Sequence, residues 1–283
     1  MKTPVQLTPI TIRGRLSLSH VLILLLTFAS SELSPMAQAV SPPPDGGYAG
    51  FNTAEGSNAL FSLTAGIWNT AIGGYALYRD TTGNSNTALG TNALRYNYTG
   101  GNNTALGVYT LYSNLYGNYN VATGFQALFS NVNGNDNTAN GHKALYQNIN
   151  GRDNTAIGTD ALVNNENGSY NTAIGVQSLA GNISGSANVA IGIQAGVGLT
   201  GSGSGNVVVG ANAGTGLSGS NNIAIGQLAA SNQTSGDNNI EIGSSGAIGD
   251  ANTIRVGSMV SRTKRLLPVF LEQRRKMSQY QSW

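Results

Sequence analysis

The chain has 283 residues, of which 39 are Gly, none is Cys and only 9% are charged. So few charges among so many turn-forming residues exclude a helical bundle and favour short strands joined by turns. The lack of Cys excludes disulfide bonds and thiolate metal sites. Residues 45–257 contain five Lys/Arg and ten Asp/Glu, a net charge of −5. Because this segment has no basic stripe, we expect no nucleic-acid partner.

Residues 1–39 have the pattern of a secretory signal peptide. Three basic residues precede the apolar run at 21–29, and small residues precede a cleavage position after Ala39. The apolar run is about half of the roughly 20 residues that a membrane span needs, so we expect export and cleavage, with no integral membrane segment afterwards. The Pro- and Gly-rich residues 40–51 are predicted to be a linker.

A 17-residue repeat organises residues 52–257. A motif of the type "NTAIG" recurs, and its Asn falls at positions 52, 69, 86, 103, 120, 137, 154, 171, 188, 206, 222 and 239. Ala lies two places after this Asn in ten repeats, and Gly lies four places after it in all twelve. Leu lies eight places after it at positions 60, 77, 94, 111, 128, 145, 162 and 179, and a second Gly lies fourteen places after it in most repeats. A variant, "NTIRVG" at 252–257, closes the series.

This period predicts a β-rich repeat solenoid, because 17 residues cannot bury a hydrophobic face alone and must stack on their neighbours. Each "NTAIG" is predicted to be a short strand in a parallel sheet, and twelve coils at about 4.8 Å each give a rod of about 60 Å. The Ala row is nearly invariant, so we place Ala and Leu inside the coil. The Ile row accepts Glu55, Thr123 and Asn140, so we place it outside. Self-association is the simplest cover for such an apolar row.

The second limb of each coil, such as residues 75–80, puts Ala and Leu side by side, which does not fit a simple strand. One alternative is a single helical turn that ends at a recurrent Asn in the left-handed conformation. The other is a short, bent second strand. The Asn in question recurs at positions 97, 114, 131, 148, 165 and 182.

These repeats resemble the YadA-like head repeats of trimeric autotransporter adhesins, and the longer "NTAIGxxAL" form resembles bacterial and phage surface-fibre repeats that usually precede a C-terminal intramolecular chaperone. The resemblance covers residues 52–257. It implies a left-handed parallel β-roll, a homotrimer, and display at the cell surface. In such a trimer the Ile row would meet its symmetry mates, and Glu55, Thr123 and Asn140 would form polar layers that fix the register.

Residues 258–283 are basic and do not repeat. One alternative is a basic amphipathic peptide that binds acidic surfaces. The other is a frameshifted remnant, because codons permitted in the shifted frame from Lys264 can spell a segment resembling the one that leads to the family's chaperone. We predict the remnant. Neither the β-barrel anchor nor the chaperone of the family is recognised in the 283 residues.

The sequence predicts no catalytic, cofactor-binding or metal-binding residues, and no enzyme activity. Two GxGxxG matches, at 196–201 and 214–219, fall where turns of adjacent coils are expected, not between a strand and a full helix. His20 lies in the signal peptide and His142 stands alone on a coil. Without a second His, a Cys or clustered carboxylates, neither a metal site nor a His-based acid–base pair can form.

One aromatic position of the repeat is a candidate for ligand contact. Phe61, Tyr78, Tyr112, Phe129 and Tyr146 share this position, with Arg95 interrupting the file. Rings on adjacent coils form a stiffening ladder in one interpretation. In the other, their flat faces grip sugars or collagen-like ligands.

The sequence therefore predicts an exported cell-surface adhesin or fibre passenger that acts by multivalent binding. Its expected partners are copies of itself in a homotrimer, and host or matrix surface molecules or glycans. A purely structural spacer rod is the alternative. Less favoured is an ice-binding solenoid, which is suggested by the column of Thr53, Thr70, Thr87, Thr104, Thr138, Thr155 and Thr172.

Overall fold

The computed structural model describes residues 48–257 except Thr234. The predicted signal peptide, most of the linker and the basic tail lie outside these residues. Within them the secondary structure consists of strands and turns, and no helix occurs. In particular, no described helix is long and apolar enough to span a membrane.

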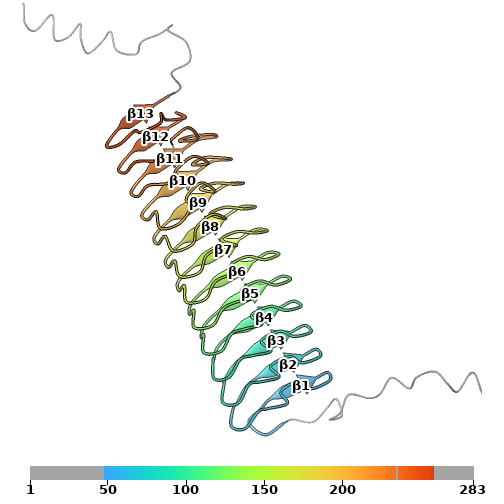
Figure 1. The fold of residues 1–283 in the computed structure, drawn as a ribbon. Coiled ribbons are helices and arrows are strands. Elements are labelled where there is room, and N and C mark those ends of the chain that lie inside the picture. Colours follow the sequence, from blue (N-terminus) through green and yellow to red (C-terminus); the bar gives the residue numbers. More distant parts are fainter. Residues whose placement is uncertain (1–47, 234, 258–283) are drawn as a thin grey trace, which may run out of the picture. The chain divides into compact units, whose positions relative to one another are not determined.

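Thirteen three-residue strands form one sheet, with one strand for each copy of the motif. Every strand pairs in parallel with the next one along the chain, so that the strands stack in sequence order from β1 to β13 (Figure 1). Equivalent residues face each other: Ala71 of β2 pairs with Ala88 of β3. The strands are β1 (Thr53–Glu55), β2 (Thr70–Ile72), β3 (Thr87–Leu89), β4 (Thr104–Leu106), β5 (Val121–Thr123), β6 (Thr138–Asn140), β7 (Thr155–Ile157), β8 (Thr172–Ile174), β9 (Val189–Ile191), β10 (Val207–Val209), β11 (Ile223–Ile225), β12 (Ile240–Ile242) and β13 (Ile254–Val256).

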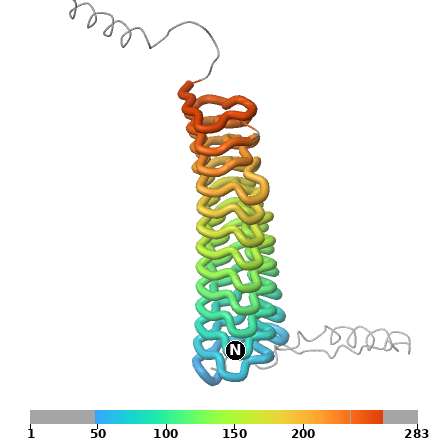
Figure 2. Tube along the Cα trace, turned by 60° about the vertical axis from the view of Figure 1, so that its left-hand side comes forward, coloured from blue at the N-terminus to red at the C-terminus, as the bar shows by residue number. Residues whose placement is uncertain are grey.

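The chain winds as a solenoid in which each coil lies directly on the one before it (Figure 2). At about 4.8 Å for each of twelve steps, the sheet is about 60 Å long. This confirms the predicted β-solenoid and its 17-residue coil.

The interior of the solenoid is narrow and lined by small residues. The middle residue of nearly every strand is a buried Ala, whereas the residues on either side face outward, as in β2, where Ala71 is buried and Ile72 is exposed. The second limb adds a buried Ala–Leu pair, such as Ala76 and Leu77. The prediction that Ala and Leu lie inside and the Ile row lies outside is therefore confirmed.

The second limb is neither a helical turn nor a strand, so both sequence-based alternatives were wrong. The Ala76 N–H donates to the Gly73 carbonyl, and Tyr75, the third residue of this turn, has a φ of 58°. A positive φ at that place is the requirement of a type II turn. Leu77 follows with a φ of 49°, and its N–H donates to the Ala93 carbonyl of the next coil. The left-handed residues of this limb are thus Tyr75 and the buried Leu77, and not the recurrent Asn.

The motif Asn closes its own coil and joins it to the next. Asn86 shows the pattern: its Nδ2 donates to the Gly100 carbonyl, fourteen residues on, at 2.8 Å. Its Oδ1 accepts from the backbone N–H of Asn103 in the following coil at 3.0 Å. These amides are buried, so each needs such partners to offset the loss of water. This explains why the motif begins with Asn in every coil.

The recurrent Asn of the second limb forms a parallel ladder. Asn114 Nδ2 donates to Asn97 Oδ1 at 2.7 Å and to the Gly117 carbonyl at 2.9 Å. Asn131 continues the ladder by donating to Asn114 Oδ1. Two rows of buried amides therefore run along the rod beside the apolar interior.

The Gly that ends each motif is required by close approach of the backbone. Gly73 has a φ of 129°, and a Cβ at this position would lie 2.6 Å from the carbonyl carbon of Gly90 in the next coil. Only Gly meets both conditions.

Candidate binding face on the solenoid

The predicted aromatic file lies on the outer surface of the second limb, directly after the buried Ala–Leu pair. Phe61 stacks on Tyr78 with ring centroids 5.4 Å apart. Further along, Phe129 lies between Tyr112 at 4.9 Å and Tyr146 at 5.1 Å, with nearly parallel rings. The structure thus brings together all five residues predicted from the sequence, in two stacks.

Arg95 fills the gap between the two stacks. Its guanidinium group lies 4.7 Å from the centroid of the Tyr75 ring and 5.7 Å from that of Tyr78. A planar guanidinium group stacks on aromatic rings much as another ring does. The substitution that interrupts the file in the sequence therefore continues the stack in the structure.

The geometry of the stacks decides which part of each ring a ligand can reach. Because the rings lie face to face along the rod axis, the flat faces of Phe129 and its neighbours are covered by one another. A ligand would meet ring edges and hydroxyl groups. Phe61, the first ring of the file, is 64% exposed. Ligand contact by the aromatic file stays a prediction, but few flat ring faces are free for a ligand to stack on.

Sequence analysis missed the side chains that flank the file. Tyr109 contacts Tyr112 edge to face, and Phe125 contacts both Tyr109 and His142. These residues occupy two other positions of the repeat, so a tabulation of aromatic residues over all seventeen positions could have found them. We call the combined surface the aromatic face. It comprises Phe61, Tyr75, Tyr78, Arg79, Arg95, Tyr96, Tyr109, Tyr112, Phe125, Phe129, His142, Lys143 and Tyr146.

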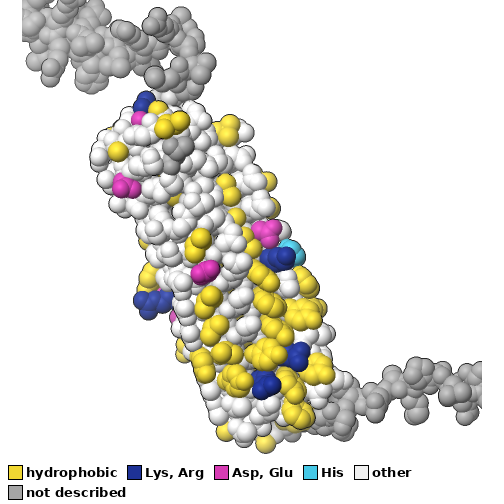
Figure 3. Space-filling model, viewed as in Figure 1, with side chains coloured by type: hydrophobic (Ala, Val, Ile, Leu, Met, Phe, Trp, Pro, Cys, Tyr) yellow, Lys and Arg dark blue, Asp and Glu magenta, His cyan; other side chains and the backbone are white. Residues whose placement is uncertain are grey.

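Figure 3 shows hydrophobic side chains gathered over the N-terminal part of the rod, with basic side chains among them. On this face His142 is exposed, stacks on Phe125 at 5.8 Å and lies 3.9 Å from Asp160. Burial raises the pKa of the Tyr112 hydroxyl, which also hydrogen-bonds Tyr96. Tyr112 is therefore neutral at ordinary pH.

Asp80 is a buried carboxyl at the first position of the second-limb Asn ladder. Its Oδ1 accepts from the Gly83 N–H at 3.0 Å and from Asn97 Nδ2 at 3.1 Å. Its Oδ2 is buried without a hydrogen-bond partner. Burial, which outweighs these hydrogen bonds, raises the pKa of Asp80 from 3.8 to about 7. Much of the Asp80 population is therefore uncharged at neutral pH.

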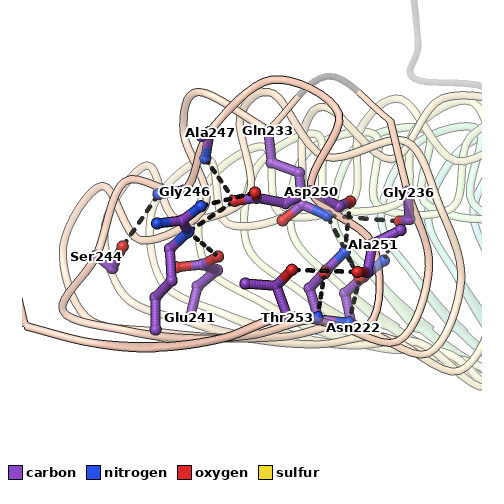
Figure 4. Close-up of polar contacts among 12 residues, drawn as sticks. Asn222, Gln233, Gly236, Glu241, Ser244, Gly246, Ala247, Asp250, Ala251 and Thr253 are labelled. Atoms are coloured by element: carbon purple, nitrogen blue, oxygen red, sulfur yellow. Dashed lines mark hydrogen bonds and ion pairs between the residues drawn. The ribbon is translucent and has the colours of Figure 1, made fainter.

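A second polar cluster closes the interior near the C-terminal end of the described coils (Figure 4). Glu241 and Arg255 occupy the interior position that is Ala in most other strands. Arg255 donates to both oxygens of Asp250, at 2.7 and 2.8 Å, and lies 3.6 Å from the buried Glu241. The hydrogen bonds from Arg255 lower the pKa of Asp250, whereas burial raises that of Glu241. Polar side chains therefore replace the apolar interior at this end of the described coils.

The outer face of the sheet carries two columns of side chains. The Ile row is about two-fifths exposed, at 39% for Ile72 and 40% for Ile191. The Thr column lies beside it on the same face, with Thr70 and Thr87 half-buried. Thr and apolar columns therefore alternate across the sheet, and the ice-binding interpretation stays a prediction.

The two GxGxxG matches lie in turns of adjacent coils, as expected from the repeat. The first GxGxxG match begins at Gly196 in the turn after β9, and the second begins at Gly214 in the turn after β10. No group of three or more His, Cys, Asp or Glu side chains suited to a metal ion occurs among the described residues.

Comparison of the chain with protein-family models, with curated proteins and with solved structures gives no match. The functional argument therefore rests on the molecule's own surfaces.

Proposed function

We propose that this chain is the exposed rod of an exported surface fibre or adhesin, and that it acts by multivalent contact with host or matrix surfaces. The observation that carries the proposal is the repetition of the same outward positions on successive coils over about 60 Å. Linked weak contacts raise overall avidity by about 10²–10⁴ without any single strong site. A solenoid with its interior filled by Ala, Leu and Asn leaves only its surface for function.

The Ile row supports assembly of the rod as a homotrimer. Ile72, Ile157, Ile174 and Ile191 belong to this row, which runs along the outer face of the sheet. Exposed apolar stripes of this length mark interaction surfaces. Around a threefold axis, each copy would cover the row of its neighbours. The polar residues that replace Ile in β1, β5 and β6 would then form layers that set the register.

A purely structural spacer is the second candidate, and the stacked aromatic file favours it because its ring faces are already covered. Binding of the purified chain to arrays of glycans and matrix proteins separates the two. If the rod is an adhesin, we expect it to be retained on specific spots of the arrays, and more strongly when several rods are clustered. A rod that binds no spot in either form is a spacer.

A further inference from the structure

Most of the described basic side chains gather on one face of the rod. Three of the described basic residues, Arg79, Arg95 and Lys143, belong to the aromatic face. Arg79 and Arg95 each lie within 6 Å of the ring centroids of Tyr78 and Tyr96, so their guanidinium groups share the same two rings. Two like charges therefore lie side by side on a body whose net charge is negative.

These three cations have no carboxylate partner among the described residues. The other two described basic residues do: Arg152 lies 4.0 Å from Asp153, and Arg255 pairs with Asp250. Asp80 follows Arg79 directly in the chain, but its carboxyl is buried in the interior and bonds Gly83 and Asn97 instead of Arg79. Asp160 lies next to His142 at one end of this face, so the uncompensated positive charge is concentrated at Arg79 and Arg95.

Arg95 also has an unused donor. Its Nη1 donates to Asn92 Oδ1 at 2.9 Å, while its Nε is buried without a partner. An anion that approached the guanidinium group would add charge-assisted hydrogen bonds and would relieve its repulsion with Arg79.

Tyrosines lie beside these cations. Six tyrosines contribute to the aromatic face, and three of them, Tyr78, Tyr112 and Tyr146, are stacked with their flat faces against neighbouring rings. Lys143 lies near Tyr146, three coils beyond Arg95, which corresponds to about 14 Å along the rod. Cations and tyrosines therefore occur together along this part of the rod, as a linear polymer running along it would require.

We propose that the aromatic face binds an acidic polysaccharide that lies along the rod axis. Its carboxylate or sulfate groups pair with Arg79, Arg95 and Lys143, and its hydroxyls hydrogen-bond the tyrosine hydroxyls. This inference rests on the proposed adhesive function and names its ligand class.

A polysaccharide fits this face better than a single-stranded nucleic acid does. Proteins that bind single strands stack bases on free aromatic faces. Here the inner ring faces, such as those of Phe129, are covered by neighbouring rings, and Arg95 lies over Tyr75. A sugar chain needs hydroxyl partners and scattered charges, which the ring edges and the three cations supply.

The test is binding of the purified full chain to polygalacturonate, dextran sulfate, uncharged dextran and poly-dT, measured by calorimetry over a range of salt concentrations. We expect one or both acidic polysaccharides to bind, with affinity falling as salt rises, and dextran not to bind. Preference between the two reports whether carboxylate or sulfate is recognised.

The double variant Arg79→Gln, Lys143→Gln removes two outward cations and leaves the stacked Arg95 in place. It should weaken polysaccharide binding by about tenfold or more, which corresponds to about 1.4 kcal/mol. The matched control Arg152→Gln removes a cation that already has an acidic partner and should change affinity by less than about twofold.

Failure of both acidic polysaccharides to bind, equal loss in the Arg152→Gln control, or tighter binding of poly-dT overturns the inference. Retention on glycan or matrix arrays that survives the double variant also overturns it, but leaves the adhesive function standing. Loss of all binding, on arrays and in calorimetry, rejects both.

Discussion

At the scale of single residues, rows of buried Asn side chains hold the coils together, and Asp80 takes the place of an Asn in one of these rows. In the coil after that of Asp80, the Gly100 carbonyl accepts from two amide groups, those of Asn86 and Asn97. The Gly83 carbonyl accepts only from Asn69 among the described side chains. Asp80 Oδ1 accepts from Asn97, as the side-chain oxygen of an Asn in this ladder does. Oδ2 of Asp80 therefore stands where such an Asn would have its amide nitrogen. Protonation of Oδ2 gives Asp80 the donor that the amide group of a ladder Asn carries.

Asp80 therefore makes the stability of the rod depend on pH. Its pKa is about 7 in the folded state and 3.8 in a model peptide. Below about pH 4 both states hold the proton, and the stability is fully present. As the pH rises towards 7 the unfolded state ionises first, so stability falls, and it stays low above pH 7. The difference corresponds to at most about 4 kcal/mol.

Asp80→Asn should remove this loss and complete the ladder. We expect little change in the free energy of unfolding near pH 4, and a gain of up to about 4 kcal/mol at pH 8. Denaturant unfolding at a series of pH values measures both. The exposed Asp136→Asn is the control and should leave the pH profile unchanged. A profile that Asp80→Asn does not flatten would show that Asp80 ionises freely in the folded protein.

At the scale of the element, each three-residue strand is too short to be stable alone, and the contact between coils decides which residues it tolerates. Gly73 and Gly74 follow β2 directly and differ in how closely the next coil approaches them. A Cβ on Gly73 would meet the backbone of Gly90, whereas a Cβ on Gly74 would have nothing within 4 Å.

Gly73→Ala should destabilise the rod by at least about 2 kcal/mol, because the φ of 129° is unfavourable for Ala and the next coil must move. Gly74→Ala should leave stability unchanged or raise it by up to about 1 kcal/mol, since Ala restricts the unfolded chain. Melting temperatures of the two variants provide the comparison. Equal effects would mean that adjacent coils are not packed as closely as described.

At the scale of the whole molecule, the open question is what covers the Ile row. The row is continuous apart from a few polar positions, and it lies on the outer face of a parallel sheet. Sheets of this kind are normally covered on both faces. Only one face is covered within a single chain, which is why we propose the homotrimer.

Ile174→Glu tests this assembly. Ile174 lies on β8 in the middle of the row and is 37% exposed, so Glu can be accommodated in a single chain but would place three charges together in the trimer. We expect a shift from trimer to monomer in sedimentation, with the circular dichroism of the solenoid retained. Gln147→Glu, an exposed position on the second limb, adds the same charge and should leave the mass unchanged. A monomeric wild-type chain, or a trimer that Ile174→Glu leaves intact, contradicts the proposed interface.

The sequence by itself determined the solenoid. A strict period, an Ala row that seldom holds a larger residue and a Gly at each strand end leave few other ways to bury the apolar side chains, so strand positions, interior and outer rows were all predictable. The aromatic file was predictable for the same reason, because residues one period apart must lie on adjacent coils.

Only the tertiary structure decided the roles that depend on how a coil closes. The sequence shows a Gly fourteen places after the motif Asn, but only the structure shows that the chain turns back so that the Asn86 side chain meets the Gly100 carbonyl. The left-handed Leu77 is held by burial rather than by its intrinsic preference, which is why a rule based on Asn failed there. The uncompensated charge of Arg79 and Arg95 emerged in the same way. Sequence shows which residues recur, but it is the packing of one coil on the next that decides which of them face the same partner.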